Sequence, residues 1–110
     1  MVRGAGDAPE YCTVEAAMEV LGGKWKLAIV KVLLTGTHRF AALQRALPTI
    51  TPRMLTRQLR ELESDRILRR TVYAEVPPRV EYDLTELGAG LAELVEWLDR
   101  WGREYRKVRA

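Results

Sequence analysis

Three arginines within residues 49–68 offer the clearest chemistry in this sequence. At 100° per residue, a helix over this stretch places the arginines on one side, almost opposite three leucines. The residues are Arg53, Arg57 and Arg60, and Leu55, Leu59 and Leu62. Guanidinium groups bind phosphates and the acceptor edge of guanine, and no acidic side chain interrupts the arginine stripe. For one isolated helix, an ordinary solvated surface explains the same pattern.

The start of this helix is marked by Thr51 and Pro52. A threonine hydroxyl caps free backbone N–H groups, and proline suits the first helical position. We therefore predict a helix over residues 52–65 with a buried leucine face and an open arginine face. If this face binds DNA, the residues nearest the bases and the adjacent backbone are Thr51, Arg53, Thr56, Arg57 and Arg60, whereas Gln58 turns toward the buried side.

Positive charge is concentrated around this helix. The net charge of the chain is only +3, but residues 37–73 contain eight arginines against three acidic residues, a local balance of +5. A nucleic-acid backbone is the polyanion that such a region would meet. Lys24, Lys26 and Arg39 are further candidates for phosphate contacts, and Arg79 for the minor groove. For Lys24 and Lys26, solvated surface is an equally good interpretation.

Composition limits the class of protein. A chain of 110 residues, 47% hydrophobic and 30% charged, fits one globular domain. Since no apolar run approaches the ~20 residues of a membrane span and the N-terminus lacks a secretory pattern, we expect a cytoplasmic protein with no membrane partner. The single histidine, His38, and the lack of metal-spaced clusters or phosphate-binding glycine loops argue against an enzyme, a metal site and a cofactor.

Shorter elements must position the arginine helix. Helical periodicity over residues 13–21 and 25–36 is interrupted by Gly22-Gly23, which can end a helix. An extended link over 37–40 leads to a short helix that Pro48 ends. Only residues 49–51 then precede the helix beginning at Pro52. Two short helices joined by about three residues form a helix-turn-helix.

The rest of the chain predicts a wing and a long helix. Residues 67–73 and 80–84 are rich in β-branched and aromatic side chains and should pair as a hairpin. The loop over 74–79 is too long and proline-rich for a two-residue turn, so it should project. A helix over 85–107 follows. The predicted fold is mainly α with a small β-hairpin, a winged helix-turn-helix, with a flexible arm over 1–11 and one domain over 12–110.

Five motifs occur in matching order and spacing over residues 12–88. They are Cys12-Thr-Val-Glu-Ala-Ala, Gly22-Gly-Lys-Trp-Lys, Arg39-Phe-Ala-Ala-Leu, the stretch from Leu47 to Glu63 and the stretch from Tyr73 to Gly88. With these motifs the sequence resembles the HxlR-type bacterial transcriptional regulators. The resemblance implies a dimeric DNA-binding regulator whose helices over 13–21 and 85–107 form the dimer interface. Repression by promoter occupancy is the simplest mode, and a winged-helix protein-interaction module without specific DNA binding is the alternative.

A homodimer also accounts for the apolar stripe of the last helix, which is larger than the flank of a small domain readily covers. The expected interface residues are Val14, Met18, Leu91, Leu94, Trp97, Leu98, Trp101 and Tyr105. The alternative is that the two tryptophans only cover the core of the monomer. A dimer would present two arginine helices to major grooves about 34–36 Å apart, which predicts a near-palindromic operator.

Cys12 is a candidate redox sensor. It precedes Thr13, the expected N-cap, and a helix N-terminus lowers a thiol pKa and favours the reactive thiolate. Glu10 and Glu15 act in the opposite direction, and a single cysteine is commonly an inert small hydrophobe. The resemblance implies more, since several relatives respond to an oxidant or a small electrophile through a cysteine at the matching position, sometimes by an intersubunit disulfide.

Overall fold

The computed structural model describes residues 11–109, with side chains from Thr13 onward. Its elements are α1 (Tyr11–Leu21), α2 (Lys26–Leu33), α3 (Phe40–Ala46), α4 (Pro52–Ser64), β1 (Leu68–Tyr73), β2 (Arg79–Leu84), α5 (Glu86–Ala89) and α6 (Ala92–Arg109). This order confirms the predicted helix-turn-helix followed by a hairpin. The arm expected over residues 1–11 lies outside the described residues, except for Tyr11, which begins α1.

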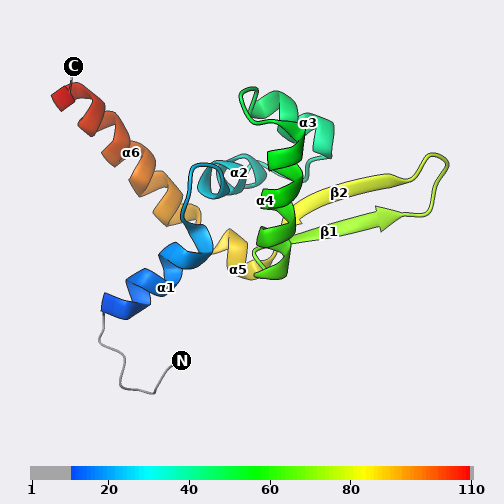
Figure 1. The fold of residues 1–110 in the computed structure, drawn as a ribbon, viewed down its shortest axis with the longest axis horizontal. Helices are drawn as coiled ribbons and strands as arrows, with labels where there is room; N and C mark the ends of the chain where they lie inside the picture. Colours follow the sequence, from blue (N-terminus) through cyan, green and yellow to red (C-terminus); the bar gives the residue numbers. More distant parts are fainter. Residues whose placement is uncertain (1–10, 110) are drawn as a thin grey trace.

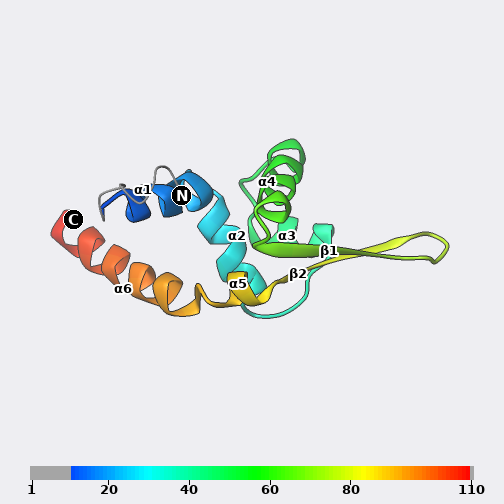
Figure 2. The same cartoon turned by 90° about the horizontal axis from the view of Figure 1, so that it is seen from below.

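The molecule is flattened, with extents of 51 × 43 × 23 Å. Figure 1 shows the β1–β2 hairpin projecting at one end and α1 and α6 diverging at the opposite end. Viewed from below, α4 stands out on one side of the hairpin (Figure 2). The arginine helix and the wing are therefore separated from the two helices expected to bind a second copy.

The hydrophobic core lies where α2, α3 and α4 meet the base of the hairpin. Its fully buried side chains are Ile29, Val30, Leu43, Leu55, Leu59, Leu62 and Leu68. Helix α2 is shorter than the predicted 25–36 segment, and it buries Val30 in addition to the expected Ile29 and Leu33. The reason is that α3, β2 and α6 all contact α2, so more than one of its faces is covered.

The turn between α3 and α4 spans residues 47–51, two residues more than predicted. Leu47 precedes Pro48 and leaves the helical region, with φ −126° and ψ 72°, because a following proline disfavours helical angles. Ile50 is 3% exposed and anchors the turn in the core. Gln44 Nε2 donates a hydrogen bond to the Ile50 carbonyl (2.5 Å), which ties the turn back to α3.

The hairpin forms as predicted, with Leu68 opposite Leu84 and Tyr73 opposite Arg79 in antiparallel register. The expected extended link also forms, because His38 pairs with Tyr82 through two backbone hydrogen bonds of 2.8 and 2.9 Å. This bridge attaches the start of the helix-turn-helix to the wing. The position of α4 relative to the hairpin is therefore held from both ends of the motif.

The prediction of one continuous helix over residues 85–107 is wrong, because the structure contains two helices separated at Gly90 and Leu91. Thr85 caps α5 by accepting the N–H of Gly88 (3.1 Å). Gly88 lies so close to the Ile67 carbonyl that a Cβ atom there would be 2.1 Å from its oxygen. Docking against the base of the hairpin thus fixes the direction of α5, and α6 leaves the domain in a new direction (Figure 1).

Candidate nucleic-acid interface

The start and the buried face of α4 fix its orientation. Thr51 is the N-cap, as predicted, and its Oγ1 accepts the N–H of Met54 (3.1 Å) ahead of Pro52. Leu55, Leu59 and Leu62 are at most 2% exposed. Since the cap sets where the helix begins and the leucines set its rotation, the opposite face must be the open one.

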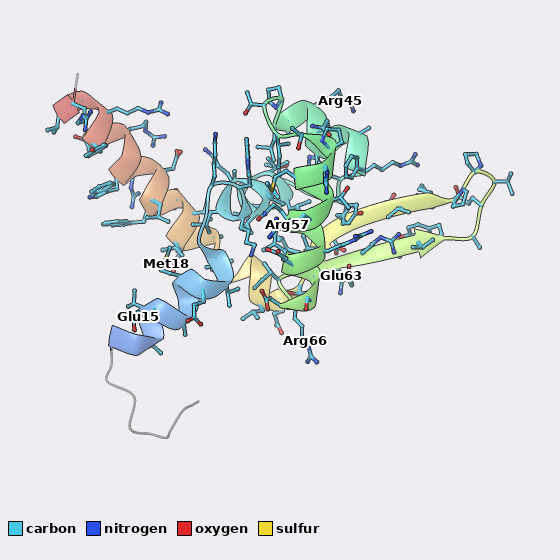
Figure 3. All side chains as sticks on the ribbon, viewed as in Figure 1. Glu15, Met18, Arg45, Arg57, Glu63 and Arg66 are labelled. Carbon is cyan, nitrogen blue, oxygen red and sulfur yellow. The ribbon has the colours of Figure 1, made fainter. Side chains whose placement is uncertain are left out.

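The open face carries the predicted arginines. Arg53, Arg57 and Arg60 are exposed, Thr56 is half-buried between them, and these four residues line a shallow hollow with Glu61. Figure 3 shows Arg57 midway along α4, whereas Arg66 lies beyond its end and points away. Gln58 turns inward, as expected, and its Nε2 contacts Met54 Sδ (3.3 Å). The hollow offers guanidinium and hydroxyl groups suited to phosphates and guanine.

A second groove lies between α4 and the hairpin. It is lined by Thr56, Leu59, Arg60, Glu63, Arg70 and Tyr82. Arg70 was not among the predicted site residues. It pairs with Tyr82 in the hairpin register and so faces α4, while Arg69 faces the other way and binds Asp83 (2.5 Å). The period of two along β1 is the sequence feature that distinguishes these arginines.

Lys26 does not lie where a phosphate contact requires. Lys26 is only 8% exposed, and its Nζ binds Glu61 Oε1 on α4 at 2.8 Å. Glu61 Oε2 accepts from Arg57 Nε (3.3 Å). The hydrogen bonds from Lys26 and then Arg57 hold the pKa of the Glu61 carboxyl below its usual range. This placement contradicts the expectation for Lys26, whose ammonium group joins α2 to α4 instead.

Lys24 and Arg39 are exposed, as phosphate contacts must be. Lys24 Nζ lies 5.0 Å from the centroid of the Trp25 ring. Arg39 is the N-cap of α3 and lines a shallow hollow with Thr37, His38, Ala41, Ala42, Arg45 and Glu81. Arg45, in the last turn of α3, was not predicted as a site residue although it belongs to the basic region (Figure 3).

Arg79 is held within the wing. Its guanidinium binds Glu75 (3.0 Å) and Glu81 (2.9 Å) and lies 4.0 Å from the centroid of the Tyr73 ring. Burial opposes its charge, but the two carboxylates outweigh this effect and raise the pKa of Arg79. A minor-groove contact by this side chain would require it to leave both carboxylates.

The residues expected at a dimer interface form an exposed apolar surface at the end opposite the wing. Leu94, Trp97, Leu98, Trp101 and Tyr105 of α6 are 37–54% exposed, and the Trp101 and Tyr105 rings stack with centroids 5.5 Å apart. On α1, Val14 and Met18 are 65% and 52% exposed. Leu91 differs, since it lies in the α5–α6 break and packs partly buried against the core. Figure 3 places Met18 and Glu15 on α1.

Cys12 is the second residue of α1, which begins two residues before the predicted N-cap Thr13. Its backbone therefore lies in the first helical turn, and its side chain is outside the described residues. Among residues 11–109, no three metal-ligating side chains gather into a site. Within the same part of the chain, every helix is too short or too polar to cross a bilayer.

Most of this chain has counterparts in known regulators. The model of the HxlR-like helix-turn-helix family matches residues 20–110. The chain belongs to the HxlR-like helix-turn-helix family. An HTH-type transcriptional regulator of Methanothermobacter thermautotrophicus is 49% identical over 100 residues, which are 91% of this chain and 76% of that protein. This HxlR-like chain is thus a transcriptional regulator with a helix-turn-helix DNA-binding fold.

Two regulators, HypR and YodB, have solved structures similar to this chain. The redox regulator HypR in its reduced form is 48% identical, with a TM-score of 0.83 over 87% of this chain and 95% of that one; an oxidised form gives a TM-score of 0.80. YodB from B. subtilis in its reduced form is 34% identical, with a TM-score of 0.75 over 84% of this chain and 91% of that one. YodB also has diamide-treated and quinone-bound structures.

Proposed function

We propose that this HxlR-like protein is a sequence-specific double-stranded DNA-binding regulator that acts as a homodimer on a near-palindromic operator and represses transcription. The observation that carries the proposal is the open face of α4, where Arg53, Arg57 and Arg60 project opposite a fully buried leucine face. Arginines on a rigid, capped helix can make bidentate contacts with guanine, and a loosely held basic segment cannot do so with the same selectivity.

Selection of duplex fragments from the source genome tests this function. The protein should enrich one sequence with two related half-sites whose centres lie about 34–36 Å apart, or a multiple of that distance. Binding to the enriched duplex should weaken steeply between about 50 and 200 mM salt, since counterions are released from the phosphates. An absence of duplex binding at low salt would favour the alternative, a winged-helix module for protein contacts.

Repression is the sign of regulation that we propose. A protein bound to a promoter through the α4 face would block that promoter, so promoter occupancy is the simplest mode of action. An in vitro transcription assay on a promoter carrying the enriched sequence should show less transcript as protein is added. A rise in transcript would reverse the assigned sign of regulation.

Control by an oxidant or electrophile at Cys12 is a second part of the proposal. It is favoured by the similarity to HypR, a redox regulator, and to YodB, which has diamide-treated and quinone-bound structures. With one cysteine in this sequence, a disulfide between two Cys12 residues must join two chains. Two Cys12 thiols would give up two protons and two electrons, and diamide, which accepts both, would become the hydrazine.

The Cys12→Ser variant tests this control. Diamide should change operator affinity of the wild type and produce a covalent dimer on a non-reducing gel, and a thiol reductant should reverse both effects. Cys12→Ser should bind the operator normally and show neither effect. If the variant remains as sensitive to diamide or quinone as the wild type, sensing does not occur at Cys12.

A further inference from the structure

We propose that Lys26 and Glu61 act as a positioning pair that presents one edge of Arg57 to the DNA and thereby sets the base preference at one position of each half-site. The inference deepens the proposed function and rests on it. Neither Lys26 nor Glu61 is assigned a base contact. Both act through Arg57, so they are positioning residues.

The three side chains form a chain of contacts from the core to the DNA-binding face. Lys26 Nζ binds Glu61 Oε1 at 2.8 Å, and Arg57 Nε binds Glu61 Oε2 at 3.3 Å. The exposed fraction of the side chain rises along this series of contacts, from 10% for Lys26 to 42% for Glu61 and 70% for Arg57. Each oxygen of the Glu61 carboxylate thus binds a different cation. One is the buried ammonium group of Lys26, and the other is the guanidinium group of Arg57, which remains accessible to a ligand.

The anchored lysine decides how firmly Arg57 is held. An exposed pair four residues apart on a helix is weak by itself, because solvent competes and two long side chains must lose freedom. Lys26 is mostly removed from solvent and packs where α2 meets the core, so its ammonium group has little water to replace Glu61. The Glu61 carboxylate is therefore held in one orientation, and it accepts the hydrogen bond from Arg57 Nε at a fixed position.

This arrangement selects the edge of the guanidinium that faces outward. Arg57 uses its Nε toward Glu61, and among residues 11–109 neither of its terminal Nη groups has a hydrogen bond or ion pair with another side chain. The two Nη groups form a fork that fits the O6 and N7 acceptors of guanine. Holding the Nε edge inward leaves this fork facing the hollow lined by Arg53, Thr56 and Arg60.

The pair also removes an electrostatic penalty. Glu61 is the one acidic residue that lines this hollow, and an uncompensated carboxylate there would repel the DNA backbone. Lys26 supplies the matching positive charge from the buried side. The open face therefore keeps its positive character while one of its arginines is held by an acid.

The experiment is selection from a randomised duplex library with the full-length wild type and four variants. Arg57→Ala should abolish the guanine preference at one position per half-site, a change of roughly 10- to 100-fold in discrimination. Glu61→Gln and Lys26→Met should weaken the preference at that same position by roughly 3- to 10-fold and leave the other positions unchanged. Lys31→Met, which removes the other ion-paired lysine of α2, should match the wild type.

Three results would overturn the inference. Glu61→Gln and Lys26→Met that keep the full preference would show that Arg57 needs no positioning pair. An equal loss at every position, together with a lower unfolding temperature, would assign the pair a structural role only. Retained preference in Arg57→Ala would remove Arg57 as the base reader while sequence-specific binding stands. A wild type that enriches no sequence would instead reject the proposed function itself, and the inference with it.

Discussion

At the residue scale, Lys26 and Arg70 lie in surroundings that their positions in the sequence do not suggest. Lys26 lies beside an exposed lysine and a tryptophan in a motif that looks like surface, but it is buried and bound to Glu61. Arg70 lies in a run of strand residues, yet it faces the groove next to α4. Each assignment depends on which neighbour, distant in sequence, lies within reach of the side chain.

Removing the two partners of the Lys26–Glu61 pair should have unequal effects on the free energy of unfolding. Glu61→Gln leaves a buried ammonium group without its counter-charge and should clearly destabilise the protein at pH 7. In Lys26→Met, water can still reach the Glu61 carboxylate, and methionine fills a volume similar to that of lysine. The free energy of unfolding of this variant should therefore stay close to that of the wild type. Urea unfolding followed by circular dichroism measures both, and a larger loss in Lys26→Met would contradict the assignment.

The pH dependence of the same pair has a defined sign. The pKa of Glu61 is lowered from its ordinary value of 4.5 in the folded protein, so the pair stabilises the fold above that pH. This contribution is lost as the pH falls through the lowered folded value. Lys26→Met should therefore lose less stability than the wild type on acidification from about pH 5 to pH 3.

Arg70 should contact phosphate and read no base. Arg70→Ala is expected to weaken binding about equally for operator and random duplex and to reduce the salt slope by about 1. Arg69→Ala is the matched control, because Arg69 faces away from the groove and is bound to Asp83. Fluorescence anisotropy over a salt series makes the comparison. A change in base preference in Arg70→Ala would refute a pure phosphate role.

At the element scale, the end of α4 is set by a strained residue. Arg66 has a positive φ of 63°, and the N–H of Ile67 reaches back to the Leu62 carbonyl (2.9 Å) in the arrangement that usually ends on glycine. The same turn directs the chain into β1, so it fixes the angle between the arginine helix and the wing.

Arg66→Gly should stabilise the protein by about 0.5–1 kcal/mol, because glycine adopts positive φ without the Cβ clash that arginine suffers. Asp65→Gly is the control, since Asp65 has a φ of −86° and should lose about 0.5 kcal/mol through the more flexible unfolded chain. Thermal unfolding at matched pH and salt distinguishes the two. Equal effects at both positions would argue against the strain.

At the scale of the whole molecule, α2 forms ion pairs with both α4 and α6. Its Lys26 binds α4, while its Lys31 binds Asp99 of α6 at 2.9 Å. Asp99 also binds Arg103, and its pKa is lowered by Lys31 first and Arg103 second. The Lys31–Asp99 pair is exposed and therefore weak, so the buried Val95 is what holds α6 against the core.

Trp101→Glu should produce monomers if the exposed stripe of α6 is the dimer interface, because the carboxylate would be buried against apolar side chains of the partner. Operator affinity should fall by roughly 100-fold or more as the second half-site contact is lost. Arg106→Glu adds the same acid at an exposed position outside the hollow that Trp97 and Trp101 line, and it should remain dimeric. Sedimentation velocity at micromolar concentration decides, and a dimeric Trp101→Glu would place the interface elsewhere.

Local patterns in the sequence determined the elements that carry function. The Thr51-Pro52 start, the leucine spacing of α4 and the alternation of β1 and β2 act over a few residues, so they were readable without a fold. The positions of Arg53, Arg57 and Arg60 on the open face followed from the same periodicity.

Tertiary structure decided what depends on contacts between distant segments. Burial of Lys26 needs α4 beside α2, the ion pairs of Arg79 need the two wing strands side by side, and the docking of α5 needs the Ile67 carbonyl beside Gly88. Helical periodicity continues across residues 85–107 and gives no sign of the α5–α6 break. Side-chain spacing along one element records which face is apolar, but only the packed fold determines which neighbour that face meets.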